Sequence, residues 1–183
     1  MMMGKIKHLA AVAVAVVAVI TMFSLQPAQA YPLTEKITHL KFYFHDTVSG
    51  KNVTAVEVAS APSTKTSATL FGKVFVLDDP LTEGPEPTSK LVGKAQGLYA
   101  SAGQEDFHLL MAVTFVFQGG KFNGSTLAMV GNNAVLKEVR EMPIVGGSGK
   151  FRLARGYALA RTHYIDFKSG NAIVLYNVTV HHY

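Results

Sequence analysis

Short stretches with the two-residue period of a β-strand follow one another along almost the whole chain after residue 30. Alternating or densely β-prone runs occur at 40–46, 54–59, 72–77, 92–100, 107–117, 125–130, 141–145, 151–162 and 172–181. Turn-forming residues separate these runs, among them Asp79-Pro80, Gly119-Gly120, Ser169-Gly170 and the glycine-rich segment 146–149. No intervening stretch has a helical period. Eight or nine short strands with hairpin-length links predict an all-β domain, either an antiparallel sandwich or a barrel.

Glycines inside the predicted strands favour the barrel over the sandwich. Gly93 and Gly97 lie in one run and Gly156 lies in another, where they would only weaken a flat sheet. In a small barrel, such glycines let strands coil. Closure also removes the exposed strand edges that promote aggregation. We therefore expect an antiparallel β-barrel.

The first thirty residues have the pattern of a secretory signal peptide. Lys5 and Lys7 give a basic start, a mostly apolar run follows at 9–23, and Ala28-Gln29-Ala30 provides the small residues of a cleavage site. The apolar run is shorter than the roughly 20 residues of a membrane span. We expect a signal peptide at 1–30, a barrel domain at 31–183 and a protein that is secreted without a membrane anchor.

Composition narrows the partners of the chain. The 17 basic and 12 acidic residues are interspersed, without the run of like charges that marks a nucleic-acid surface. The chain has no cysteine, so stability must come from core packing, sheet closure or oligomerisation. The last predicted strand is apolar on both faces, which favours an oligomer whose interface covers its outer side.

Three glycosylation sequons occur, and a secreted protein would expose them to the glycosylation machinery. They begin at Asn52, Asn123 and Asn177. Asn52 lies in a predicted turn and is the best candidate. Asn177 lies in a predicted strand and would be unusable if it faced inward.

Motifs of common catalytic classes are missing from the sequence. There is no Gly-x-Ser-x-Gly elbow, cysteine nucleophile, His-Glu-x-x-His, phosphate loop or dinucleotide fingerprint. The adjacent His181 and His182 point to opposite faces of a strand and do not suit one metal ion. We expect no metal and no cofactor.

Asp46 is the first candidate for chemistry. Strand alternation places it on the same face as Phe42 and Phe44, with His45 on the opposite face, at the outer surface or between subunits. If the aromatic face is internal, burial raises the pKa of Asp46 and keeps part of the population protonated. The commoner role of an aspartate at a strand end is to bind turn amides.

Two further polar residues have similarly open roles. Tyr99 would bind a phenolic ligand through its hydroxyl or serve as a core tyrosine. Arg140 would stabilise an anionic oxygen, although its neighbours Glu138 and Glu141 favour a surface ion pair. On the residues alone, a ligand-binding barrel of lipocalin type and a barrel enzyme remain equally open.

The order of several longer motifs resembles the plant dirigent proteins over essentially the whole chain after residue 30. These motifs are FYFHD at 42–46, FGKVFVLDDPLT at 71–82, SKLVGKAQGLY at 89–99, FNGSTLAMVG at 122–131, REMPIVGGSGKFRLARGYA at 140–158 and the ending HHY. The resemblance implies an eight-stranded antiparallel barrel, secreted to the apoplast, usually trimeric, with a pocket at one end. It also implies a glycoprotein of phenylpropanoid metabolism that holds no redox centre.

Two kinds of chemistry follow from this resemblance. Some members direct the coupling of phenoxy radicals, made from coniferyl alcohol and similar phenols by an external laccase or peroxidase, toward optically active lignans. Others act on quinone methides, and one class dehydrates isoflavanols to pterocarpans. The main expectation is stereochemical control of either reaction. Isoflavanol dehydratase and passive carrier of hydrophobic phenolics are the alternatives, so whether the chain is an enzyme stays open.

The resemblance also carries site roles onto residues of this chain. It implies Asp46 as proton donor and Arg140 as an orienting residue, with Tyr99 as a hydrogen-bonding phenol. Phe42, Phe44 and Asn133 are the expected substrate contacts.

One departure from the family pattern bears on the choice between the chemistries. Pinoresinol-forming relatives tend to carry an aspartate where Asn133 stands, and they carry a cysteine pair that this chain lacks. An amide cannot supply a proton as an acid does. The chain therefore resembles the subgroup that holds the pterocarpan-forming dehydratases.

Overall fold

A computed structural model describes residues 34–183, and the predicted signal peptide lies outside this part. The described chain is almost entirely β-structure, with three short 3-10 helices in its connections, η1 (Pro62–Thr66), η2 (Gly120–Phe122) and η3 (Gly149–Phe151). The strands are β1 (Lys36–Asp46), β2 (Ala55–Ala59), β3 (Val74–Thr82), β4 (Leu91–Ser101), β5 (His108–Phe117), β6 (Thr126–Ala134), β7 (Arg140–Ser148), β8 (Arg155–Ile165) and β9 (Ala172–His182).

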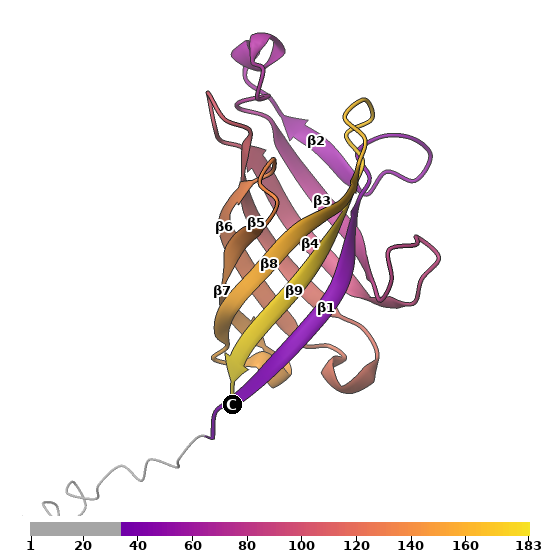
Figure 1. Ribbon diagram of the computed structural model, residues 1–183, viewed down its shortest axis with the longest axis vertical. Helices are drawn as coiled ribbons and strands as arrows, with labels where there is room; N and C mark the ends of the chain where they lie inside the picture. Colours follow the sequence, from indigo (N-terminus) through magenta and orange to yellow (C-terminus); the bar gives the residue numbers. More distant parts are fainter. Residues whose placement is uncertain (1–33) are drawn as a thin grey trace, which may run out of the picture. The chain divides into compact units, whose positions relative to one another are not determined.

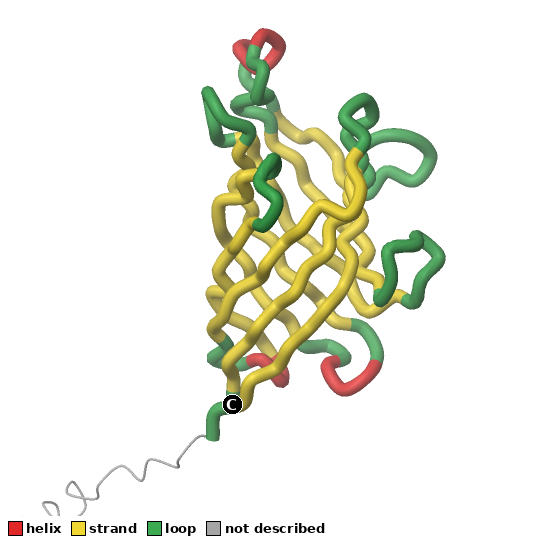
Figure 2. The backbone as a smooth tube through the Cα atoms, viewed as in Figure 1, coloured by secondary structure: helices red, strands yellow, loops and turns green. Residues whose placement is uncertain are grey.

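These strands close into an antiparallel barrel, as Figures 1 and 2 show. The order around the sheet is β1-β9-β8-β7-β6-β5-β4-β3-β2, and a further pairing of β1 with β3 completes the ring. The ring has eight strand positions. β1 pairs with one part of β3 and the short β2 pairs with the other part, so β1 and β2 share one position in the ring. The predicted eight-stranded antiparallel barrel is confirmed.

Two expected turns are wrong. Asp79 and Pro80 lie inside β3, and Gly146 and Gly147 lie inside β7. Pro80 lies close to the point where the partner of β3 changes from β2 to β1. Because the hydrogen-bond ladder is interrupted there, the missing amide of proline costs little.

Alternation along the strands fills the barrel with aromatic side chains. Phe42, Phe115 and Tyr176 pack at its centre, with ring centroids 5.0 Å apart for Phe42 and Phe115 and 5.9 Å for the stacked pair Phe42 and Tyr176. Towards the end that carries the C-terminus, Phe151 packs against Phe117 at 5.6 Å and edge-on to the His182 ring at 5.2 Å. This end of the barrel is therefore filled by rings.

The strand glycines are required by close approach of neighbouring backbones. A Cβ atom at Gly93 would lie 2.3 Å from the Val116 carbonyl oxygen, and one at Gly156 would lie 2.0 Å from that of Thr179. Both distances are far below van der Waals contact. These positions permit the tight coiling that closes the ring.

No helix within residues 34–183 is long and apolar enough to cross a membrane.

Candidate functional site in the barrel mouth

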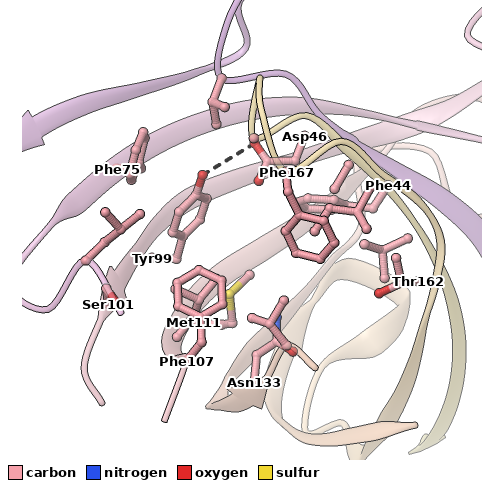
Figure 3. A pocket seen from close by; sticks show the side chains of 18 of the residues that line it. Phe44, Asp46, Phe75, Tyr99, Ser101, Phe107, Met111, Asn133, Thr162 and Phe167 are labelled. Carbon is pink, nitrogen blue, oxygen red and sulfur yellow. Dashed lines mark hydrogen bonds between the residues drawn. The ribbon is translucent and has the colours of Figure 1, made fainter. Parts of the chain in front are cut away.

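A cavity of about 360 Å³ opens at the barrel end opposite the C-terminus (Figure 3). This volume falls within the range of pockets that hold small organic molecules. Side chains of Phe44, Met111 and Tyr176 line it among others, and Asp46, Tyr99 and Arg140 add polar groups. The mouth is formed by strand ends and their loops, so residues far apart in the sequence meet there. The cavity is mainly apolar with a few converging polar groups, which is typical of a small-molecule site.

Asp46 ends β1 and lies in this cavity together with Tyr99 of β4. The Tyr99 hydroxyl donates a long hydrogen bond of 3.5 Å to Oδ1 of Asp46 (Figure 3). The Tyr99 ring stacks on Phe75 with centroids 5.0 Å apart, which holds the hydroxyl in position. Burial raises the pKa of Asp46 to about 6, and the Tyr99 hydrogen bond offsets part of that rise. Asp46 is thus a weaker acid than an exposed aspartate, and about half of it is protonated near pH 6.

The alternative role of Asp46 as a turn residue is taken by another side chain. The backbone amides of Val48 and Ser49 donate to Oδ1 of Asn171, at 2.9 and 3.1 Å. Asp46 contributes no hydrogen bond to this turn. Its carboxyl group is left to face the cavity.

Arg140 begins β7 and is buried, with 4% of its surface exposed. Its Nε donates to Oδ1 of Asn133 at 3.1 Å, and its Nη1 donates to Oγ1 of Thr162 at 2.9 Å. Among residues 34–183, no carboxylate lies within ion-pair distance of Arg140.

The expected surface ion pair of Arg140 is therefore wrong. Glu138 binds Arg161 instead, at 2.6 Å. Burial lowers the pKa of Arg140. The result is a positive charge at the cavity wall that neutral oxygens hold in place.

The structure brings together most of the predicted site residues. Phe44 and Asn133 line the same cavity as Asp46, Tyr99 and Arg140. Phe42 differs from the expectation, since it is not among the lining residues of this cavity and packs beneath Tyr176 and Phe115 in the core. Its ring stacks on that of Tyr176, which does line the cavity.

Other lining residues were not predicted from the sequence. Tyr176 points into the barrel, as do Val178 and Val180 at every second position of β9. This alternation was the signal in the sequence that could have found it. Phe107 and Phe167 come from connections between strands, whose paths no periodicity predicts. Thr162 joins the site only through the pairing of β8 with β7.

The expectation that His45 lies at the surface is wrong. It points away from the cavity as predicted, yet only 6% of its surface is exposed. The Thr82 hydroxyl donates to the Gly84 carbonyl at 2.7 Å and therefore accepts from Nε2 of His45 at 2.6 Å. Burial lowers the pKa of His45. This histidine attaches β1 to the end of β3.

The three sequon asparagines all have exposed side chains. Asn52 and Asn123 lie in connections, and Asn177 lies on the outer face of β9. The possibility that Asn177 faces inward is thereby removed.

Within residues 34–183, no three metal-binding side chains come close enough to hold an ion.

The family model described as Dirigent-like protein matches residues 37–181, which is nearly all of the barrel. Dirigent protein 23 of Arabidopsis thaliana is 57% identical over 148 residues, covering 81% of this chain and 79% of that protein. Pterocarpan synthase 1 of Glycine max is 51% identical over 161 residues, covering 87% of each chain.

A solved structure gives the same result for the fold. That of a pterocarpan synthase dirigent protein superposes with a TM-score of 0.79 at 52% identity, covering 84% of this chain and 88% of the other. Family match, sequence identity and fold thus agree with the cavity and its polar groups. The chain belongs to the dirigent family.

Proposed function

We propose that this protein generates and closes quinone methides of phenolic substrates stereoselectively, by dehydrating an isoflavanol-type alcohol to a cyclic ether. The observation that carries the proposal is the position of the Asp46 carboxyl group inside an aromatic cavity, where burial raises its pKa. Pterocarpan synthases more than half identical to this chain support it. A general acid works best when its pKa lies near the working pH, and burial brings the pKa of Asp46 from 3.8 to about 6, closer to neutral.

The chemistry needs one proton at a defined place. Asp46 donates its proton to the hydroxyl group that leaves, the carbon–oxygen bond breaks, and water departs. The phenol of the aromatic ring that bears this carbon loses its proton to solvent water, and its electrons form the quinone methide. A second hydroxyl group of the substrate then attacks the methide carbon and gives its proton to the Asp46 carboxylate. The quinone oxygen takes up a proton as the ring becomes aromatic again, so that water is the net loss.

The two polar sides of the cavity provide orientation. Asp46 and Tyr99 lie on one side, whereas Arg140 lies on β7, separated from β1 by β8 and β9. The Arg140 charge stabilises the oxygen on which negative charge collects as the methide forms or closes. Aromatic rings between these groups hold the planar substrate. A substrate fixed at both ends exposes one face of its methide carbon to attack.

A second candidate is a scaffold for radical coupling. Several relatives above 50% identity are named dirigent proteins without a dehydratase activity in their names. In that case an external laccase or peroxidase makes the phenoxy radicals, and the cavity only sets which faces meet. A passive carrier of hydrophobic phenolics is the third candidate, which the same cavity would serve.

One pair of assays separates these functions. The protein is incubated with a racemic 2′-hydroxyisoflavanol alone, and with coniferyl alcohol with and without an oxidase. The proposal predicts a single pterocarpan enantiomer from the first mixture. A scaffold gives an optically active coupling product only when the oxidase is present. A carrier leaves the products racemic in every mixture, which contradicts both other functions.

Secretion and glycosylation are part of the proposal. The basic and apolar pattern of residues 1–30 and the exposed Asn52, Asn123 and Asn177 support an apoplastic glycoprotein. Such a location would give the cavity access to phenolics outside the cell.

We further propose a homotrimer that buries the outer face of β2–β6. A row of small to medium apolar side chains crosses these strands in register. Its members are Val56, Val76, Leu98, Ala112 and Val130. Four of these are well exposed, from 39% for Leu98 to 50% for Val56. None of the large hydrophobic side chains exposed in residues 34–183 lies on β9, so the interface is proposed here and not at the last strand.

A further inference from the structure

Asp79 is a buried acid that the proposed reaction does not use. Its side chain is fully buried, with 0% exposed. It points into the barrel, as do the side chains of Leu77 and Leu81 on the same strand. Within residues 34–183, neither of its carboxyl oxygens has a hydrogen-bond donor. It is also absent from the cavity lining. A buried carboxyl group in this state requires an explanation, because an unpaired buried charge is expensive.

Strand register places Asp79 next to Asp46. In the β1–β3 pair, Phe44 lies opposite Leu81. Two residues later on β1 and two residues earlier on β3, the same register reaches Asp46 and Asp79. Both side chains therefore point to the same side of the sheet as Phe44 and Leu81. Beyond this point residues 47–53 loop out, and the Asp78 amide donates to the Thr54 carbonyl at 2.9 Å as β2 takes over. Asp79 therefore lies on the strand next to Asp46, and it is not one of the residues that line the cavity.

Among residues 34–183, no positively charged group contributes to the pKa of Asp79. Asp46 faces it from β1, Tyr99 from β4 and Tyr176 from β9, and all three interact with it electrostatically. Asp78 precedes it but points outward and binds Lys94 at 2.5 Å. Burial raises the pKa of Asp79 to about 8, and the charge of Asp46 adds to this rise. The nearby Thr54 hydroxyl offsets part of the rise, although it makes no hydrogen bond to Asp79 in this structure.

We propose that Asp79 and Asp46 form an acid pair that shares protons, in which Asp79 acts on the reaction through Asp46 as a positioning residue. Two carboxyl groups held close together inside a barrel oppose each other's ionisation, because the second charge would be added beside the first. Asp79 thus keeps its proton while Asp46 gives its own to the substrate. The pair then carries one negative charge, which is removed when the attacking hydroxyl group returns a proton to Asp46.

This pair extends the working range of the acid. Between the two ionisations a single proton remains on the pair, and it spends part of its time on Asp46. The protein therefore retains some of its acid form at a pH where an isolated carboxyl group would be ionised. This catalytic consequence rests on the proposed function, whereas the pair itself does not.

Titration of the carboxyl groups tests the pair without any substrate. Protein labelled with ¹³C in its aspartate carboxyl groups is titrated by NMR, as wild type, Asp46→Asn and Asp78→Asn. We expect two separate ionisations for the buried pair in the wild type. In Asp46→Asn the Asp79 ionisation moves to lower pH, because the facing charge is gone. Asp78→Asn is the matched control, which removes an adjacent but outward charge, and it should move Asp79 less. If Asp79 titrates at the same pH in the wild type and in Asp46→Asn, the proposed acid pair is wrong.

The pH dependence of the reaction tests the catalytic consequence. Wild-type activity should fall in two steps as the pH rises, with a shoulder between them. Asp79→Asn, which cannot ionise, should fall in one step, while Asp78→Asn keeps the wild-type shape. Coincident profiles for Asp79→Asn and wild type contradict the role of Asp79. If no tested phenolic is converted, the proposed function fails, and the titration still decides whether the pair exists. If Asp79→Asn does not fold, the Asp46→Asn titration still decides whether the pair exists.

Discussion

Arg140 donates from Nε to Oδ1 of Asn133 over 3.1 Å, so an amide and not a carboxylate holds the buried cation of the cavity. An aspartate at this position would be ionised, because the adjacent guanidinium holds the pKa of a carboxyl group well below its usual range. It would therefore make a poor proton donor. Dehydration in this chain should depend on Asp46 alone as the acid at the cavity surface.

The double variant Asp46→Asn/Asn133→Asp checks this division of roles. We expect it to remain as inactive as Asp46→Asn, because the new carboxyl group gives its charge to Arg140. Product yield and enantiomeric excess are measured for both single variants and the double variant. Recovery of activity in the double variant would show that the side of the cavity near Arg140 also supplies the proton.

Asp46→Asn should lower the rate of product formation by about 10²-fold or more, since a positioned general acid contributes roughly 10²–10⁴. The amide keeps the shape of the side chain, so phenolic binding and folding should change little. Rates are compared with ligand affinity from fluorescence or calorimetry. Asp106→Asn, at an exposed loop position, is the control. Equal rates for Asp46→Asn and wild type would remove Asp46 from the mechanism.

Tyr99→Phe should raise the pKa of Asp46. The Tyr99 hydroxyl donates to the carboxylate and so favours its ionised form, and phenylalanine lacks this donor while keeping the stacking on Phe75. The pH at which activity falls should move upward. A pH–rate profile measures this shift. A downward shift would mean that the hydroxyl stabilises the protonated acid.

Stability should decrease as the pH rises from about 4 to 8. The folded-state pKa of Asp79 is raised from 3.8 to about 8, so the folded protein binds a proton that the unfolded chain has released. This contribution is fully present below the unfolded pKa and is lost as the pH passes the folded one. A shift of this size corresponds to about 5 kcal/mol, or on the order of 10 °C in Tm.

Asp79→Asn should flatten that dependence, because its side chain does not titrate. Melting curves at several pH values compare the variant with the wild type and with Asp78→Asn. The pKa of Asp78 is lowered mainly by Lys94, so its removal should change stability in the opposite sense with pH. A wild-type Tm that does not fall across this range would show that Asp79 is not a buried neutral acid.

Leu98→Glu should convert the proposed trimer to monomers. Leu98 lies at the centre of the apolar row, and a charge there would be desolvated in the interface. Light scattering after size-exclusion chromatography measures the mass. Asn177→Gln, on the outer face of β9, is a control that should leave the assembly unchanged. A wild type that is monomeric at micromolar concentration contradicts the trimer.

Local periodicity was enough to predict most of the β-structure. Inward and outward positions along β1 follow directly from alternation, so Phe44 and Asp46 could be assigned to one face. The same rule failed at Asp79-Pro80, because composition cannot tell a turn from a proline at a change of strand partner. His45 illustrates a second limit. Its outward direction was predictable, but its burial depends on Thr82 at the end of another strand.

The sequence by itself determined the all-β class, the interior parity of individual strands and the motifs that identify the family, since these depend on spacing along the chain. Only the tertiary structure decided that Arg140 binds Asn133 and Thr162 instead of its charged neighbours. It alone also placed Asp79 on the strand next to Asp46, because closure of the barrel sets which strands meet and in what register. Burial and pairing depend on contacts between distant segments, and a pattern of residue types does not encode them.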